Sequence, residues 1–208
     1  MKITKAKTIA VVALLLFAFT LGGCGGKDAH WGKTFDEKGS WWKQEGQSWD
    51  RETNVFMTIG YSNPDWKDKY DARKSADLNA RAQVSEFMAS LVKSYMEETR
   101  SRHFTISESI VRSVANETVL GSVIVARKFK KKQYMSLIKV DLGYFFGTVY
   151  KQYMAESEAK IRRANPKATE SELDEMIRAK VDSAVENLKK AEEPAVEKAV
   201  AAEAEVAQ

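Results

Sequence analysis

Few residues of this 208-residue chain could carry out side-chain chemistry. Cys24 is the only cysteine, so no disulfide can form within the chain and no zinc site can be built from cysteines. The two histidines, His30 and His103, are too few for most histidine-based metal sites and catalytic triads. Neither a nucleophile-elbow motif nor an HExxH motif occurs. The sequence therefore predicts a protein that is not an enzyme and that carries no metal and no other cofactor.

The carboxylates that come closest to a metal-binding pattern are Asp65, Asp68 and Asp71, which are spaced by three. Calcium loops space their ligands by two and include a glycine. Acidic residues are also favoured at the N-terminus of a helix, where they interact with the helix dipole. We therefore interpret these three residues as the start of a helix and not as metal ligands.

The single cysteine ends a segment that is typical of exported proteins. Lys2, Lys5 and Lys7 precede an apolar run over residues 9–21. A helix that crosses a bilayer needs about 20 apolar residues, and this run is shorter. A basic start followed by a short apolar run is the pattern of a secretory signal peptide. Residues 1–23 are therefore predicted to be a signal peptide.

Residues 21–24 resemble the lipobox of bacterial lipoproteins, in which an aliphatic residue and two small residues precede a cysteine. The resemblance implies that a signal peptidase recognises Leu21, Gly22 and Gly23 and that Cys24 becomes the acylated first residue. Two or more acyl chains give stable membrane anchoring. Gly25 stands where an aspartate would retain an enteric lipoprotein in the inner membrane, so the implied location is the outer membrane, facing the periplasm. A buried cysteine, or a membrane span that happens to end in cysteine, is the alternative.

The overall positive charge is largely a property of this export segment. The chain has a net charge of +4 and a pI near 9.0, but residues 1–23 contain three lysines and no acid. The remaining residues have a net charge of +1, divided between +5 for residues 24–154 and −4 for residues 155–208. Nucleic acid is therefore not expected as a partner.

A dense run of cations follows in the middle of the chain: Arg127, Lys128, Lys130, Lys131 and Lys132. Such a run could bind anionic lipid headgroups, peptidoglycan carboxylates or an acidic partner. It could equally be a solubilising turn, or a guard against pairing of an exposed sheet edge.

Residues 24–50 hold four of the five tryptophans and show no helical or strand periodicity, so we interpret them as a flexible tether. Trp41 and Trp42 are candidates for docking a partner or a membrane interface, where indole rings are favoured. The alternative is that these rings pack back onto the domain and fix the tether to it.

The periodicity after residue 50 predicts an α+β domain over residues 51–145. A strand over 52–61 ends at Gly60, and a long helix capped by Asn63 begins at Pro64 or Tyr70 and ends near residue 98. Ala76 and Ala80 would allow this helix to lie close to a sheet. A short helix over 107–116 and two strands over 118–129 and 133–142 follow, the strands forming a hairpin that reverses at residues 130–132.

The C-terminal part is predicted to be helical. A helix begins near Gly143 and is broken by Asn165 and Pro166, and residues 146–190 form a helical arm. Thr169 and Glu172 have the spacing of a capping box that opens a second helix, which ends near residue 190. Residues 191–208 are rich in Ala and Glu and include Pro194, so they are predicted to be a disordered tail, with a frayed helix as the alternative. The whole is a small antiparallel sheet of about three strands, packed by a long helix, with an extended C-terminal helical arm.

Three segments resemble a known lipoprotein family: VFMTIGY at 55–61, the Ala/Arg-rich stretch over 72–82 and VLGSVIV at 119–125. They are similar to the Lpp-twenty lipoproteins and to the N-terminal domain of flagellar assembly protein T, over about residues 52–145. The resemblance implies an outer-membrane-associated, non-enzymatic domain and supplies no ligand-binding or catalytic residue.

The sequence thus predicts a lipid-anchored structural or assembly factor of the cell envelope or of a surface appendage. Its partner would be an envelope protein or peptidoglycan. The alternative is a periplasmic binding module for a soluble or cell-wall-derived ligand. A concave pocket lined by Trp41, Trp42 or Tyr150 would favour the binding module, and a filled helix–sheet interface would favour the structural protein.

Overall fold

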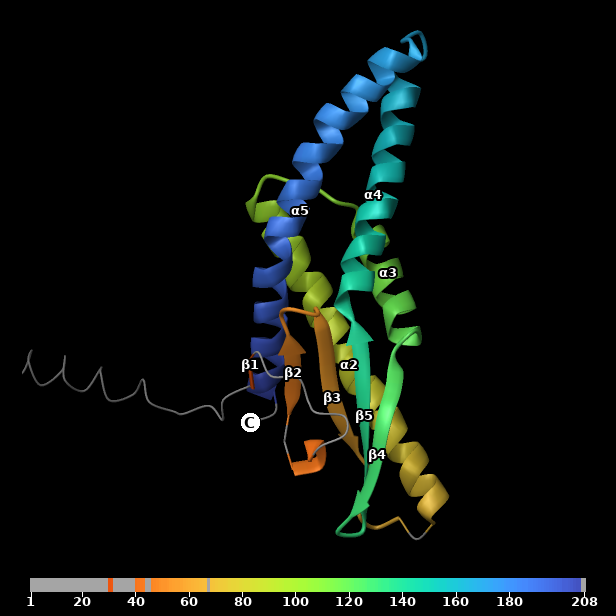
Figure 1. Ribbon diagram of the computed structural model, residues 1–208, viewed down its shortest axis with the longest axis vertical. Helices are drawn as coiled ribbons and strands as arrows, with labels where there is room; N and C mark the ends of the chain where they lie inside the picture. The colour runs from red at the N-terminus through yellow and green to blue at the C-terminus, as the bar shows by residue number, and fades with distance from the viewer. Residues whose placement is uncertain (1–29, 32–39, 44–45, 67, 207–208) are drawn as a thin grey trace, which may run out of the picture.

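The computed structural model describes residues 30–31, 40–43, 46–66 and 68–206. One sheet has the strand order β1-β2-β3-β5-β4, with all neighbours antiparallel except β1 and β2 (Figure 1). The elements are β1 (His30–Trp31), the 3-10 helix η1 (Trp41–Lys43), β2 (Gln47–Asp50), β3 (Val55–Tyr61), α2 (Lys69–Ser101), α3 (Glu108–Leu120), β4 (Val123–Lys130), β5 (Gln133–Asp141), α4 (Leu142–Ala164) and α5 (Glu170–Val206).

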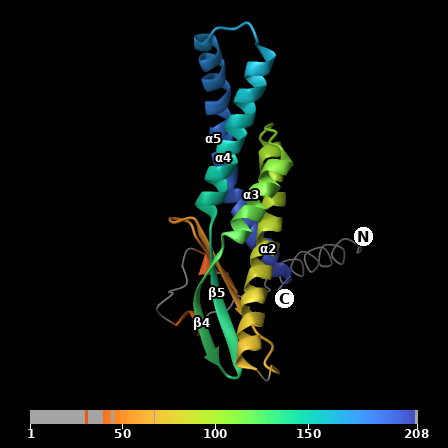
Figure 2. The ribbon, with the colours of Figure 1, turned by 90° about the vertical axis from the view of Figure 1, so that its right-hand side faces the viewer.

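The predicted α+β fold, with an antiparallel sheet packed by a long helix, is confirmed. The sheet is wider than the three strands expected, because residues 47–50 pair with β3 instead of belonging to a flexible tether. Helices α2 and α3 lie on one face of the sheet (Figure 2). Helices α4 and α5 extend beyond it as a helical hairpin, and α5 returns to lie beside α2 (Figure 1).

Gly60 determines how closely α2 approaches the sheet. The predicted end of the strand at residue 61 is confirmed, but β3 begins at Val55 and not at residue 52, and Gly60 lies within the strand and does not end it. A Cβ atom at position 60 would lie 2.2 Å from the backbone nitrogen of Ala80 and 2.4 Å from the carbonyl oxygen of Ala76. Both alanines are fully buried, as their predicted contact with a sheet requires. Position 60 must therefore lack a side chain so that the helix can contact the sheet, and not because the chain turns there.

Helix α2 begins later than the predicted asparagine cap. Its N-cap is Asp68, whose carboxylate accepts hydrogen bonds from the backbone N–H groups of Tyr70 and Asp71. Asn63 instead accepts a hydrogen bond from the N–H of Asp65 at 2.9 Å and closes a separate turn. The interpretation of the spaced aspartates as a helix start therefore applies to Asp68 and Asp71.

The boundary between α3 and β4 also differs from the prediction. Residues 118–120 form the last turn of α3 instead of the start of a strand. Thr118 is buried one helical turn after Val114, and its hydroxyl donates to the carbonyl oxygen of Val114 at 2.8 Å. The buried face of the helix thus continues through residues whose valine and threonine content favours a strand.

The predicted β4–β5 hairpin is confirmed, with Lys130 paired to Gln133 across a two-residue turn. Both turn residues have positive φ, +50° at Lys131 and +64° at Lys132. Turns of this kind match the twist of a hairpin and strongly favour Asn-Gly. A residue with a Cβ in the left-handed region costs about 1–2 kcal/mol.

The prediction of a disordered tail is wrong for residues 191–206, which continue α5. Ala191, Ala195 and Ala199 are fully buried, and the core that contains them also contains Leu91 and Tyr95 of α2. Small side chains four residues apart let two helices approach closely, and the burial offsets the effect of Pro194 within the helix. The composition that suggested disorder is thus the composition of a helix–helix contact.

The capping box that opens α5 is confirmed. The backbone N–H of Thr169 donates to the Glu172 carboxylate at 2.8 Å, and the N–H of Glu172 donates to the Thr169 hydroxyl at 3.4 Å. The hydrogen bond from the Thr169 backbone holds the pKa of Glu172 below its usual value. The predicted break at Asn165 and Pro166 is also present, between α4 and α5.

Candidate functional site

The lipidation motif, Leu21, Gly22, Gly23 and Cys24, lies outside the described residues. The first described residue after it is His30, in β1. Acylation of Cys24 therefore stays a prediction of the sequence.

Trp41 closes the face of the sheet opposite α2. It is 3% exposed and packs with apolar side chains of β3 and β5: Val55, Met57, Ile59, Met135 and Leu137. Trp49, in β2, is also buried, and its indole N–H donates to the Asn54 side-chain oxygen at 3.1 Å. The alternative that the tryptophans pack back onto the domain is confirmed for these two residues, and Trp41 does not present its ring to a partner.

The structure brings together two predicted site residues that are far apart in the sequence, Trp42 and Lys128. The half-buried Trp42 ring contacts Trp41 edge to face, with the ring centroids 6.0 Å apart. The Lys128 ammonium nitrogen lies 4.4 Å from the centroid of the Trp42 ring, a cation–π contact. Lys128, which lies in β4, therefore makes a contact within the molecule that holds Trp42 next to this strand.

Arg127 is also committed within the molecule, to Asp77 of α2. Its Nε and a terminal nitrogen each donate to the Asp77 carboxylate at 2.9 Å, and Ser136 of β5 donates to the same carboxylate at 2.5 Å. Partial burial raises the pKa of Asp77, but the hydrogen bonds from Arg127 and Ser136 outweigh it and leave that pKa below its usual value. No local sequence pattern signals this pairing, because Arg127 and Asp77 are 50 residues apart.

The other cations of the run stay exposed at the end of the hairpin. Lys130, Lys131 and Lys132 are joined there by Lys69 of α2, whose ammonium nitrogen lies 5.6 Å from the centroid of the Phe129 ring. Phe129 is itself 44% exposed. We call these five residues the basic tip. The basic tip differs from the predicted cation run. It lacks Arg127 and Lys128, and it adds Lys69 and Phe129.

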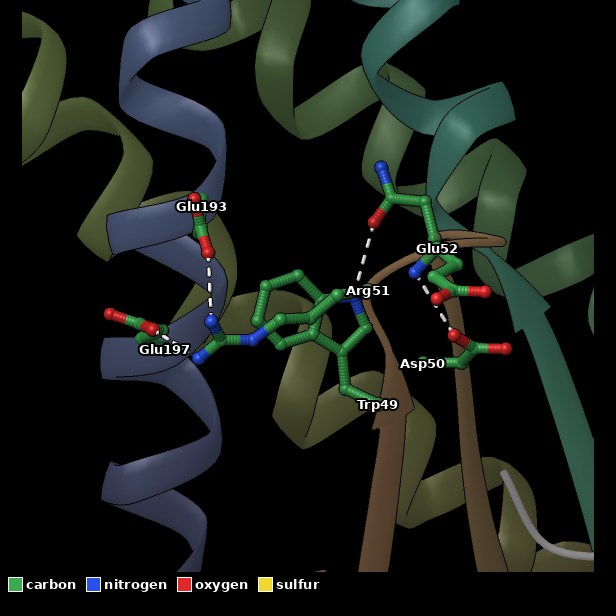
Figure 3. Close-up of polar contacts among 7 residues, drawn as sticks. Trp49, Asp50, Arg51, Glu52, Glu193 and Glu197 are labelled. Carbon is green, nitrogen blue, oxygen red and sulfur yellow. Dashed lines mark hydrogen bonds and ion pairs between the residues drawn. The ribbon is translucent and has the colours of Figure 1, made fainter. Parts of the chain in front are cut away.

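A second polar cluster, which the sequence did not suggest, joins the β2–β3 turn to α5 (Figure 3). The guanidinium of Arg51 contacts the carboxylates of Glu193 at 3.0 Å and Glu197 at 2.5 Å. It also lies 5.4 Å from the centroid of the Trp49 ring. The Asp50 carboxylate accepts the backbone N–H of Glu52 and shapes the turn that presents Arg51. Exposed ion pairs contribute little stability, so this contact adds little to the packing of the buried alanines that hold α5 in place.

Glu192, a half-buried residue of α5, makes stability depend on pH. Burial raises the pKa of this carboxyl to about 7, above its value of 4.5 when unperturbed. The folded state thus holds a proton that the unfolded state loses, and stability decreases as the pH rises from about 4.5 through 7.

We expect Glu192→Gln to remove this loss of stability, about 1–2 kcal/mol after allowance for partial exposure. Thermal unfolding at pH 5 and pH 8 tests it: the variant should unfold at a higher temperature than the wild type at pH 8 only, and an equal difference at both pH values would contradict the assignment.

Among the described residues, no group of three or more His, Cys, Asp or Glu side chains is placed to hold a metal ion. Within the same part of the chain, no helix has the length and apolar character needed to cross a bilayer. In comparisons with known proteins, no family model, no curated protein and no solved structure matches this chain. The resemblance to the Lpp-twenty lipoproteins therefore stays a prediction.

Proposed function

We propose that this protein is a lipid-anchored outer-membrane lipoprotein that acts as a non-enzymatic structural or assembly factor of the cell envelope. The observation that carries the proposal is the lipobox, residues 21–24, whose cysteine is the only one in the chain. The acyl groups on Cys24 would fix the protein to the membrane. The folded domain would then present surfaces to an envelope protein or to peptidoglycan.

The filled interior of the domain supports a structural role over a ligand-binding role. Trp41 is buried against one face of the sheet, and Tyr150 packs half-buried against the main core. The helix–sheet interface contains fully buried Phe56, Phe87 and Leu91. Small-molecule sites are concave and lined by such side chains, but here these side chains contact one another. This filled core supports the structural reading.

The arrangement of the helices is suited to holding a partner at a distance from the membrane. Helix α5 has 37 residues, which corresponds to about 55 Å of helix. The hairpin of α4 and α5 projects from the opposite end of the molecule to the basic tip (Figure 1). Its exposed side chains include Met154 and Met176. We propose this arm as the surface that contacts the envelope partner.

Site-specific crosslinking in the native envelope tests the proposal. A photoreactive residue at position 154 or 176 should capture a defined envelope protein or peptidoglycan. The capture should be lost when residues 1–24 are replaced by a signal peptide that is cleaved without lipidation. A matched probe at the exposed residue Leu78 of α2, away from the arm, serves as control. Equal binding of one soluble ligand by the anchored and released forms would instead support a periplasmic binding module.

A further inference from the structure

The turn at the basic tip holds residues that serve the hairpin poorly. Lys131 and Lys132 both have positive φ, where Asn-Gly is the favoured pair. A turn that served only to reverse the chain, or to keep it soluble, would not require lysine at these two positions. Left-handed residues with side chains are uncommon and point to a role outside the turn itself.

Exposed aromatic rings accompany the lysines at this end of the molecule. Trp66, Tyr70 and Phe129 are 48%, 65% and 44% exposed. The segment that carries the first two is tied to the hairpin, because the N–H of Ser62 donates to the Tyr134 carbonyl at 2.9 Å. The tip of the hairpin and the start of α2 lie at the same end in both views (Figures 1 and 2). Aromatic rings mixed with lysines are typical of surfaces that lie at a membrane interface.

The charge of this end is positive after its acids are counted. Its described cations are Lys69, Arg73, Lys130, Lys131 and Lys132, and its described acids are Asp65, Asp68 and Asp71. Asp68 is occupied as the helix cap. Arg127 and Lys128 are left out of this count because they contact Asp77 and Trp42. The excess of cations is complementary to a surface of negative charge.

We infer that the basic tip, together with Trp66 and Tyr70, rests on an anionic phospholipid surface, that of the membrane that holds the lipid of Cys24. The inference rests on the proposed function, because it takes the anchor as given. It names a second contact with the same bilayer, made by the folded domain. In this orientation, the arm of α4 and α5 points away from the membrane.

The chain is long enough for both contacts. Strand β1 runs parallel to β2 and therefore in the direction of β5, which starts at the tip, so the N-terminal side of His30 faces the tip. His30 is aligned, through Ser48 and Met57, with Lys139. Lys132 lies seven residues before Lys139, about 23 Å along the strand. Cys24 precedes His30 by six residues, which span up to about 22 Å. The acyl chains extend further from the Cys24 side chain, so the lipid and the tip can reach one bilayer.

The test uses the full-length lipidated protein in vesicles of neutral phosphatidylcholine, with or without anionic phosphatidylglycerol. Acylation blocks Cys24, so an introduced cysteine is the only free thiol for a nitroxide label. Pro64→Cys places the label at the tip end, and Lys167→Cys places it in the exposed turn between α4 and α5. The label at position 64 should be protected from a water-soluble relaxation agent only in the anionic vesicles. The label at position 167 should stay accessible in both.

The double variant Lys131→Asn/Lys132→Gly separates charge from folding. It removes two cations and installs the preferred turn, so its melting temperature should equal or exceed that of the wild type. We expect the ratio of membrane-bound to free tip to fall about 30-fold, because each lysine near an anionic surface changes it about fivefold. A variant that melts normally and stays equally protected would overturn the inference.

Three further outcomes would each contradict either the membrane contact or the lipid anchor. Equal accessibility of the position 64 label in both kinds of vesicle would overturn the membrane contact and leave the anchor intact. Protection that requires added peptidoglycan or a protein partner would likewise overturn it, in favour of that partner. A protein that does not float with the vesicles at all would contradict the proposed lipid anchor.

Discussion

Gly60→Ala should destabilise the protein by about 3 kcal/mol or more, because the new methyl group would overlap backbone atoms that cannot move independently. The methyl carbon would lie 2.2 Å from the Ala80 nitrogen and 2.6 Å from the Ala80 Cα. The whole of α2 would have to shift away from β3. Thermal unfolding should show a melting temperature lower by about 10 °C, or loss of the folded protein.

Gly147→Ala is the matched control for this substitution. Gly147 lies within α4, and a Cβ atom there would meet no atom within 4 Å. Alanine is a better helix former than glycine, so this variant should gain about 0.5–1 kcal/mol. If both variants lost stability equally, close helix–sheet contact at Gly60 would not be the cause.

Trp41→Ala should destabilise the protein by about 3–5 kcal/mol, since it leaves a cavity over the face of the sheet opposite α2. The indole is 3% exposed and contacts apolar residues of two strands. Denaturant unfolding measures the free-energy change. Val55, Met57 and Leu137 should become accessible to solvent, which hydrogen exchange of β3 and β5 would report.

Trp42→Ala serves as the control for Trp41→Ala. Trp42 is only half-buried, and it loses one edge-to-face ring contact and the cation–π contact with Lys128. These contacts are worth about 1–2 kcal/mol together, so the loss should be clearly smaller. A larger loss for Trp42 than for Trp41 would mean that Trp42, and not Trp41, closes the sheet.

Local patterns predicted most of the elements correctly. The alanine spacing in α2, the hairpin of β4 and β5, the break at Asn165 and the capping box of α5 each depend on residues close in sequence. The errors arise where contacts between distant segments decide. Residues 191–206 resemble a disordered tail until the partner helix α2 is known, and Gly60 resembles a strand end until α2 crosses it.

The candidate site shows the same limit. Composition identified a basic run and a tryptophan cluster, and the fold brings one member of each together, Lys128 and Trp42. Composition did not show which of these cations and tryptophans contact other residues of the same chain. Arg127 forms an ion pair with Asp77, and Lys128 makes a cation–π contact with Trp42. Trp41 packs against the sheet. Lys69 and Phe129 join the exposed lysines only through the folded arrangement of α2 and the hairpin.

The proposed membrane anchor depends on acylation of Cys24, and intact-mass spectrometry of the protein purified from its own cell membranes tests this modification directly. We predict a mature chain that begins at Cys24 and carries the added mass of a diacylglyceryl group, with or without a further acyl chain on the amine. A chain that still begins at Met1, or one that is cleaved elsewhere and has an unmodified cysteine, would contradict the proposal of a lipid-anchored envelope protein.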